Sequence, residues 1–198
     1  MKHKNSQKRI YFNGAVYFIT FNTLKNFPYF DEDILCRLFI KELNFCQKYQ
    51  HFEIIAYKIN PEHIHLLIKP KGKYNYSQIM GAIKRNFARD ANRLISPVNS
   101  HDVEGDDPDR RLQHHGTRHH QPENFIKYRK RIDKFIKSHK PHFQKINLPK
   151  FKWQKSFHDH YIRDEIDFFN HVAYIKRQHI KHNLSANKWV YVSNSFFR

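Results

Sequence analysis

Two histidines separated by one isoleucine, His63 and His65, have a spacing that suits a metal site. They stand at the head of an apolar run that ends at Ile68, which is typical of a buried strand. Side chains alternate between the faces of a strand, so both imidazoles point one way and Ile64 points the other way. Two adjacent imidazoles can hold a divalent cation. In a chain with 16 histidines, they can also be two half-exposed polar residues, and the spacing alone leaves both interpretations open.

The second candidate for chemistry is Tyr174, in a helix predicted from Glu165 to about Lys181 with Asp164 as its N-cap. At 100° per residue, several polar side chains fall within about 60° of this tyrosine: Asp167, His171, Gln178 and Lys181. The opposite arc is apolar and holds Phe168, Phe169, Val172, Ile175 and Ile180. A tyrosine needed only for core packing would lie on the apolar arc, so its position favours a reactive phenol or a plain surface residue.

These residues need a scaffold, and the chain alternates strands with helices. Strands are predicted at residues 15–21, 53–59, 63–68 and 157–163, and helices at 31–49, 78–94 and 165–181. Ser77 is the expected cap of the second helix. Because only Asn60, Pro61 and Glu62 separate two strands, they form a hairpin. The order predicts an α+β fold: a ferredoxin-like split βαβ sheet, four-stranded and antiparallel, with a C-terminal helix that carries the tyrosine.

The composition changes abruptly after Ser96. From Pro97 to Pro122 almost nothing is apolar, which indicates an exposed loop. A basic helix is expected over residues 124–140, broken up by Pro141 and Pro149. We therefore predict one domain made of residues 1–96 and 150–198, with a basic insertion, a mobile loop plus a helix, at 97–149. The tail after Leu184 has enough apolar residues for a short packed strand or a partner contact.

The charge balance limits the class of partner. The 198 residues carry a net charge of +18, which favours a polyanion, most simply nucleic acid. A membrane surface is the competing polyanion, but no apolar run approaches the ~20 residues of a span and no signal peptide opens the chain. Cys36 and Cys46 fall in one predicted helix, so neither a disulfide framework nor a cysteine zinc site is expected. These features predict a cytoplasmic protein.

Basic residues on the second predicted helix are candidates for contacts with a nucleic-acid backbone. Lys84, Arg85 and Arg89 share its outer face with Arg93. Cations on a helix often form no more than a solvated face. In so basic a chain, however, the same face suits phosphate binding.

Taken together, these motifs resemble those of a known family. The run Pro61-Glu62-His63-Ile64-His65 looks like the histidine-hydrophobe-histidine signature of HUH nucleases. The run Tyr174-Ile175-Lys176-Arg177-Gln178 is similar to the tyrosine helix of the single-tyrosine HUH transposases, the IS200-like enzymes that move insertion sequences. The stretch Trp153-Gln154-x-x-Phe157-x-x-His160-x-Ile162-Arg163-Asp164 resembles the REP-associated tyrosine transposases. The resemblance covers residues 10–95 and 151–184. Unlike those relatives, the chain lacks Asn-Pro after the tyrosine and has no glycine at the helix end.

The resemblance implies a metal-dependent endonuclease and strand transferase that acts on single-stranded or hairpin DNA, as a homodimer. His63, His65 and Gln178 would bind one Mg²⁺ or Mn²⁺. Tyr174 would attack a phosphate and form a 5′-phosphotyrosine link, freeing a 3′-hydroxyl. A phenol has a pKa near 10, so a nearby positive charge must assist. The expected backbone contacts are Lys84, Arg85, Arg89, Arg163, Arg177 and Lys181.

Two alternatives from other classes remain. The first is a non-catalytic module that binds single-stranded nucleic acid by stacking bases on exposed Tyr17, Phe21 and Tyr57, as RRM sheets do. The second is a zinc hydrolase that uses His63 and His65. Its only nearby carboxylate is Glu62, which strand alternation is expected to turn to the other face.

Overall fold

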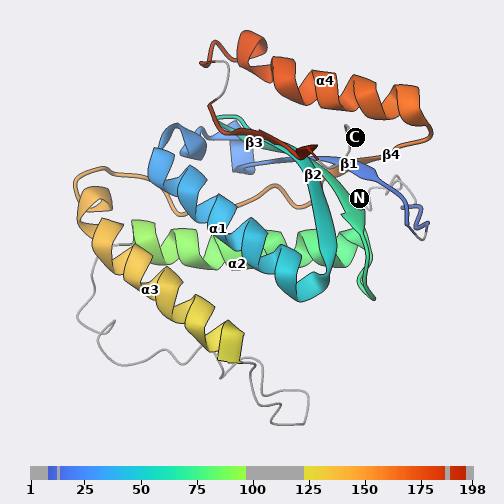
Figure 1. Cartoon of the computed structure of the whole chain (residues 1–198). Helices are drawn as coiled ribbons and strands as arrows, with labels where there is room; N and C mark the ends of the chain where they lie inside the picture. Colours follow the sequence, from blue (N-terminus) through green and yellow to red (C-terminus); the bar gives the residue numbers. More distant parts are fainter. Residues whose placement is uncertain (1–8, 13, 97–122, 186–187, 195–198) are drawn as a thin grey trace, which may run out of the picture. The chain divides into compact units, whose positions relative to one another are not determined.

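The computed structural model describes residues 9–12, 14–96, 123–185 and 188–194. It divides into two compact units. The first comprises the residues up to Arg89 together with those from Phe151 onward, and the second comprises Asp90–Lys150. Each unit is described by itself, and Figure 1 labels their elements. No helix in the described ranges combines the length and apolarity that crossing a membrane requires.

The first unit is built on one antiparallel sheet with the strand order β4-β1-β3-β2-β5. The strands are β1 (Tyr17–Asn22), β2 (Phe52–Ile59), β3 (His63–Pro70), β4 (His158–Tyr161) and β5 (Val190–Val192). The predicted α+β class and ferredoxin-like strand order are confirmed. The prediction of four strands is wrong, because three residues of the tail pair with β2 as a fifth strand.

Three helices pack around this sheet: α1 (Asp33–Gln50), α2 (Tyr76–Ile95) and α4 (Glu165–Lys181). Asp31 was predicted to open the first helix, but it ends a separate 3-10 turn, η2 (Tyr29–Asp31). A second such turn, η1, spans Leu24–Asn26. The Asp164 carboxylate accepts the backbone N–H of Asp167, so the predicted cap of α4 is confirmed.

The start of α2 differs from the prediction, because the helix begins one residue before Ser77. Asn75 Oδ1 accepts the N–H of Gln78, and Gln78 Oε1 accepts the N–H of Asn75, both at 3.0 Å. This reciprocal pair is a capping box, which satisfies two backbone donors that a serine alone cannot.

Both faces of the sheet are covered (Figure 1). On one face, Val172 and Ile175 of α4 pack against Ile55, Ala56 and Leu67. The register of β2 shifts between Ile54 and Ala56, so two consecutive β2 residues join this cluster.

The other face carries an aromatic core in which Phe21 packs against Phe39 of α1. Tyr17 and Phe21 are 2% and 0% exposed. Tyr57 is half-buried and stacks on Tyr191 of β5. The expectation that these aromatics are exposed for base stacking is therefore wrong.

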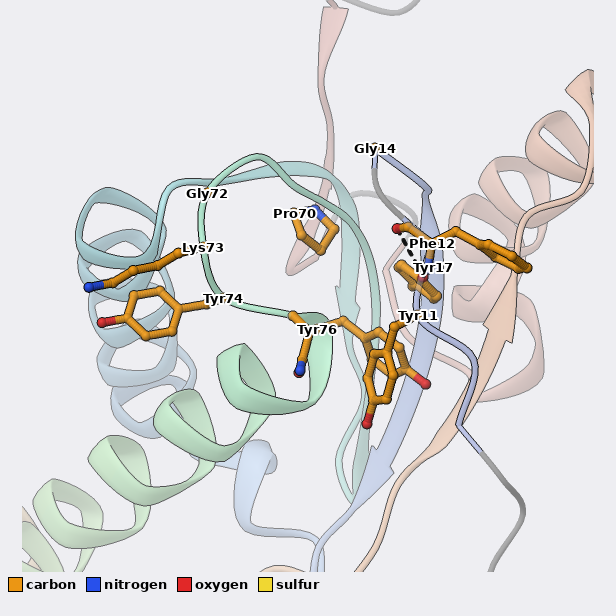
Figure 2. Close-up of a pocket in the computed structure, with 10 residues that line it drawn as sticks. Tyr11, Phe12, Gly14, Tyr17, Pro70, Gly72, Lys73, Tyr74 and Tyr76 are labelled. Atoms are coloured by element: carbon orange, nitrogen blue, oxygen red, sulfur yellow. Dashed lines mark hydrogen bonds between the residues drawn. The ribbon is translucent and has the colours of Figure 1, made fainter.

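The segment before β1 lies along the sheet near the start of α2 (Figure 2). It borders a pocket of about 160 Å³, and four of the ten residues that line this pocket are tyrosines. Tyr17 stacks on Tyr76 at 4.1 Å, and Tyr11 lies 5.1 Å from Tyr76. The Tyr76 hydroxyl donates to Asp159 and the Tyr17 hydroxyl accepts from the Phe12 amide. The Phe12–Tyr17 hydrogen bond and the Tyr11–Tyr76 ring contact therefore attach the segment to β1 and to the start of α2.

The second unit contains the end of α2 and the helix α3 (Glu123–Phe143). Pro141 lies inside α3, so the prediction that it breaks this helix is wrong. A bidentate ion pair joins the two helices, with Arg129 donating to both oxygens of Asp90 at 2.7 and 3.1 Å. The loop predicted between Pro97 and Pro122 lies outside the described residues.

Candidate active site

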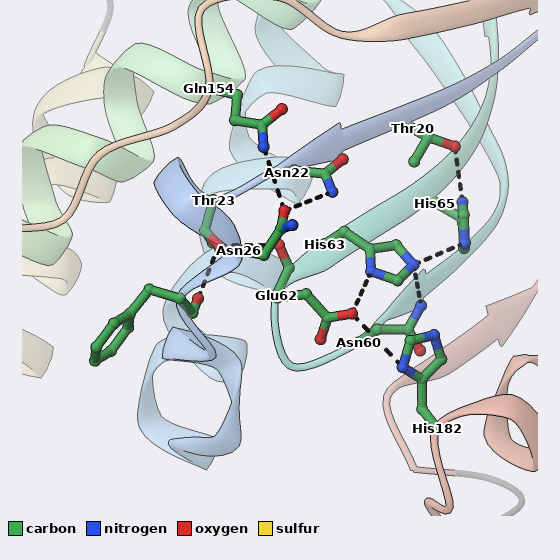
Figure 3. A network of polar contacts seen from close by, with 11 residues as sticks. Thr20, Asn22, Thr23, Asn26, Asn60, Glu62, His63, His65, Gln154 and His182 are labelled. Atoms are coloured by element: carbon green, nitrogen blue, oxygen red, sulfur yellow. Dashed lines mark hydrogen bonds and ion pairs between the residues drawn. The ribbon is translucent and has the colours of Figure 1, made fainter.

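His63 and His65 lie side by side at the start of β3, and Figure 3 shows their rings converging. Their Nε2 atoms are 3.1 Å apart. The side chains are buried, at 8% and 3% exposure. Across the sheet, β1 places Thr20 opposite His65 and Asn22 opposite His63. The strand alternation predicted from the sequence therefore produces two facing imidazole nitrogens.

The other ring nitrogen of each histidine, Nδ1, contacts a polar side chain on the side of the ring away from the pair. His63 Nδ1 lies 3.0 Å from the Glu62 carboxylate, and His65 Nδ1 lies 2.8 Å from the Thr20 hydroxyl. A metal-binding histidine almost always has such an outer partner, which fixes its tautomer and ring orientation. The arrangement leaves the two Nε2 atoms as the inward-facing donors.

Burial keeps both imidazoles neutral. Removal from water, with a smaller contribution from neighbouring His63, lowers the pKa of His65 to about 3. Burial also lowers the pKa of His63, with Glu62 partly opposing the effect. At neutral pH both rings are therefore unprotonated, which is the form that a metal binds.

Gln178 of α4 brings an oxygen to the same place. Its side chain lies against His65, where it partly offsets the lowering of the His65 pKa. Gln178 is 3% exposed, and its Oε1 atom has no hydrogen-bond partner among the described residues. A buried carbonyl oxygen without a partner costs about 1–3 kcal/mol, and a cation bound beside the two neutral imidazoles would offset that cost.

These residues fit a divalent metal ion. Two nitrogens that each lie about 2.1 Å from one ion, at a right angle, are about 3.0 Å apart. The observed separation of the His63 and His65 Nε2 atoms is 3.1 Å. The unpartnered Gln178 oxygen supplies a third, harder donor of the kind that Mg²⁺ and Mn²⁺ prefer.

Tyr174 lies at the edge of the same site. Its ring is 5.1 Å from that of His65, edge to face, and 5.8 Å from that of Phe18. The side chain remains 43% exposed, so a large substrate can reach the hydroxyl. Val172 and Ile175 hold α4 on the sheet of its own chain. The tyrosine therefore approaches the histidines of the same polypeptide.

The apolar arc predicted for α4 is only partly buried. Val172 and Ile175 are 3% and 0% exposed, as that pattern requires. Phe169 and Ile180 are 43% and 71% exposed, so their predicted place in the buried arc is wrong. Two polar residues, Asp167 and Gln178, are instead part of the buried face of α4.

Sequence reasoning missed several residues around the pair. Glu62 contacts His63, although alternation was expected to turn it away; β3 begins only at His63, so Glu62 belongs to the turn, where strand alternation does not apply. Asn60 is 1% exposed and its Nδ2 lies 2.9 Å from His63 Nε2. The ring of His182 lies 4.9 Å from that of His63. The pattern of the sequence gives no signal for Asn60 or His182, because a turn and a helix end bring them in.

The end of α4 explains how the chain manages without the glycine of its relatives. Asn183 follows the helix with φ of 50°, in the left-handed region that asparagine tolerates better than most residues. His182 N–H bonds to the Gln178 carbonyl at 3.1 Å. The helix thus ends at Lys181 without a glycine, and Gln178 lies in its last turn.

A second cluster of histidines lies around Asp167. His160 Nε2 is 2.8 Å from Asp167 Oδ2, and His171 Nδ1 is 3.1 Å from Oδ1. Arg163 adds its backbone N–H and its Nε, at 3.1 and 3.2 Å. Burial alone would raise the pKa of Asp167, but the hydrogen bonds from His160 and Arg163 outweigh it and hold the pKa far below its ordinary value. This carboxylate is saturated with donors.

The predicted backbone contacts have different surroundings. Lys84 Nζ donates to the carbonyls of Gln154 and Ser156 at 2.8 and 3.1 Å, and burial lowers its pKa to about 8. Arg163 pairs with Asp167. The Arg163 side chain is nevertheless exposed, and so are those of Arg85, Arg89, Arg177 and Lys181.

Lys84 and Arg85 also border a cavity of about 400 Å³. Its other lining residues are Arg9, Ser77, Gly81, Lys155 and Phe157. Four of the seven are cationic and none is acidic, so the cavity suits an anionic ligand such as a phosphate.

Comparisons with known proteins agree with the sequence motifs. Residues 14–105 match the family model described as "Transposase IS200 like". A structure of a REP-associated tyrosine transposase bound to a REP hairpin matches with 18% identity and a TM-score of 0.55, over 90% of this chain and 74% of that one. A crystal structure assigned as a transposase from Deinococcus radiodurans aligns with 13% identity over 92% of this chain and all of that one, but its TM-score is only 0.44. No curated protein matches. The resemblance to IS200-like transposases is confirmed, together with the fold.

Proposed function

From the match of residues 14–105 to the IS200-like transposases, we propose that this chain is a metal-dependent endonuclease and strand transferase for single-stranded DNA. One observation carries the proposal. Tyr174 stands 5.1 Å, ring to ring, from one of two facing neutral histidines in the same chain. A nucleophile beside a metal site is the arrangement that phosphodiester cleavage through a covalent intermediate needs.

The chain's own residues divide the work. Mg²⁺ or Mn²⁺, held by His63, His65 and Gln178, would supply Lewis-acid stabilisation of the charge that develops on a phosphate oxygen. Tyr174 loses its proton to solvent and attacks the phosphorus. The bond from phosphorus to the 3′-oxygen breaks, the 3′-oxygen takes up a proton, and the 5′ side stays linked to the tyrosine. Attack by another 3′-hydroxyl reverses the step, so strand transfer consumes no nucleotide.

Cations around the fold supply the grip on DNA in this proposal. The cavity lined by Arg9, Lys84, Arg85 and Lys155 would hold the backbone, and the exposed Arg89, Arg163, Arg177 and Lys181 would extend the contact. The structural neighbour is bound to a REP hairpin, which supports hairpin or single-stranded DNA as the ligand here. We include in the proposal a homodimer acting in the cytoplasm.

A zinc hydrolase that uses the same histidines is disfavoured. Its base would have to be Glu62, the carboxylate nearest the pair. Glu62 lies at Nδ1 of His63, on the outer side of the ring, whereas the two Nε2 atoms face each other on the inner side. A base must reach the water that it activates, so this carboxylate serves better as a support for His63.

The test is capture of labelled hairpin DNA on the protein in the presence of Mn²⁺, resolved on a denaturing gel. Tyr191→Phe is the matched control, because Tyr191 is also a half-exposed tyrosine, at 42% exposure, and its ring stacks on Tyr57 of β2. We expect an adduct with the wild type and Tyr191→Phe, and none with Tyr174→Phe or with a chelator. An adduct that persists in Tyr174→Phe would refute the assigned nucleophile. Tight, salt-sensitive binding with no adduct in any variant would indicate a non-catalytic module that binds single-stranded nucleic acid.

A further inference from the structure

Asn60 is a second buried amide beside the facing histidines. It is 1% exposed, and the turn before β3 fixes it there, because its backbone N–H bonds to the His63 carbonyl at 2.9 Å. Its Nδ2 lies 2.9 Å from His63 Nε2. The other end of the amide, Oδ1, is buried and has no hydrogen-bond partner among the described residues. Figure 3 shows the amide on the inner side of His63.

The present hydrogen bond cannot coexist with a metal on His63. The Asn60 amide donates to the lone pair of His63 Nε2, and Glu62 occupies the Nδ1 side of the ring. A ligating nitrogen uses that same Nε2 lone pair. The N–H groups of Asn60 would then face a coordinated atom and a positive ion, which is repulsive.

Rotating the Asn60 side-chain amide by 180° removes this conflict. It exchanges Nδ2 and Oδ1, two ends of similar size, and brings the oxygen to the place now 2.9 Å from His63 Nε2. The rotation breaks no hydrogen bond of the oxygen, because Oδ1 has no hydrogen-bond partner among the described residues. The rotated amide therefore presents an oxygen that can bind a divalent cation, in place of N–H groups that would repel it.

We propose that Asn60 is a further ligand of the metal at this site, through its side-chain oxygen. The inference rests on the proposed function, which assigns the ion to His63, His65 and Gln178. With Asn60 the donor set becomes two imidazole nitrogens and two amide oxygens, all uncharged. None of these four ligands is a carboxylate, so none of them neutralises the positive charge of the ion, which acts fully on the phosphate.

This donor set also selects the class of ion. Imidazole nitrogens suit first-row transition ions, whereas Mg²⁺ prefers oxygen ligands and retains several waters. A half-nitrogen set therefore favours Mn²⁺ over Mg²⁺, and it disfavours Ca²⁺, which takes six to eight oxygens.

The experiment is calorimetric titration of the full chain with Mn²⁺ alone, without DNA. Asn60→Ala removes the amide. Asn60→Asp keeps an oxygen but removes the N–H that now bonds to His63. Asn22→Ala is the matched control, because Asn22 lies opposite His63 on β1 and its amide is tied to Asn26. Thermal melts establish that each variant is folded.

If Asn60 is a ligand, Asn60→Ala weakens Mn²⁺ binding about tenfold or more, Asn60→Asp binds as well as or better than the wild type, and Asn22→Ala is unchanged. If Asn60 serves only as a hydrogen-bond donor to His63, Asn60→Asp fails like Asn60→Ala, and the inference is wrong. Should the alanine variant not fold, the aspartate variant decides alone. Equal affinity of Asn60→Ala and wild type would overturn the inference and leave the proposed function intact. A wild type that binds no Mn²⁺ would overturn both.

Discussion

Two histidine clusters of similar composition have opposite electrostatic outcomes. Around His63 and His65, burial pushes the rings toward the neutral form, and the pKa of His65 falls to about 3. Around Asp167, two histidines and an arginine converge on one carboxylate, whose pKa lies far below its usual value. Glu62, His63 and His182 offer donor atoms within 4.8 Å of one another, and so do His160, Asp167 and His171. Proximity alone therefore cannot tell a metal site from an ion-pair network.

The two clusters differ in whether their acceptor atoms have hydrogen-bond partners. The first cluster contains buried oxygens without partners, on Asn60 and Gln178. In the second, Asp167 Oδ2 accepts from His160 and Arg163, and the Arg163 guanidinium already supplies the positive charge that an ion would bring. Unsatisfied acceptors beside neutral imidazoles, more than the number of histidines, therefore mark the metal candidate.

The largest effect should come from removing one histidine from each cluster. We expect His65→Ala to reduce Mn²⁺ affinity at least about 100-fold, because it deletes an inward-facing ligand. His171→Ala should leave the affinity unchanged. Calorimetric titration of both variants measures this. Equal losses in the two variants would show that the clusters are not functionally distinct.

A second comparison concerns stability. Asp167→Asn should lower the free energy of unfolding by about 2 kcal/mol at pH 7, a value reduced by the exposure of its partners His160 and Arg163. Because the pKa of Asp167 is depressed in the folded state, its contribution is present above the ordinary carboxyl pKa of about 4 and is lost as the pH falls below it. Urea unfolding from pH 7 to pH 3 should show the two proteins converging. A constant difference would contradict the ion-pair role.

The smallest effect is expected from the support behind His63. Glu62→Gln should weaken Mn²⁺ binding about tenfold, because the carboxylate orients the ring and raises its basicity. The free energy of unfolding should change by less than about 1 kcal/mol, since the Glu62 side chain is 25% exposed. A large loss of stability with unchanged affinity would assign Glu62 to the fold instead.

The sequence could predict those parts of the site that depend on neighbouring residues in the chain, but not those that depend on contacts between distant segments. Alternation within β3 is local, so the facing geometry of His63 and His65 could be predicted. The same reasoning failed for Glu62, one residue earlier, because a turn has no alternation. Thr20 supports His65 only through the register of β1 with β3, which no local pattern encodes.

The fold shows the same limit. The order of strands and helices predicted the ferredoxin-like sheet, but β5 has only three residues, Val190–Val192, too few for periodicity to distinguish from a loop. Pro141 was expected to end its helix, yet α3 continues to Phe143. A proline restricts the residue before it and removes one donor, but only two residues of α3 follow Pro141, so the disturbance is confined to the last turn.

The attachment of α4 by Val172 and Ile175 has a consequence for inheritance. In this arrangement the phenol and the imidazoles are encoded in one reading frame and meet within one polypeptide. If two damaged gene copies coexist, one without the tyrosine and the other without a histidine, neither product can lend the other its missing half. If Tyr174 and the histidines act as proposed, each gene copy must encode both groups intact to remain active, and selection acts on each copy separately.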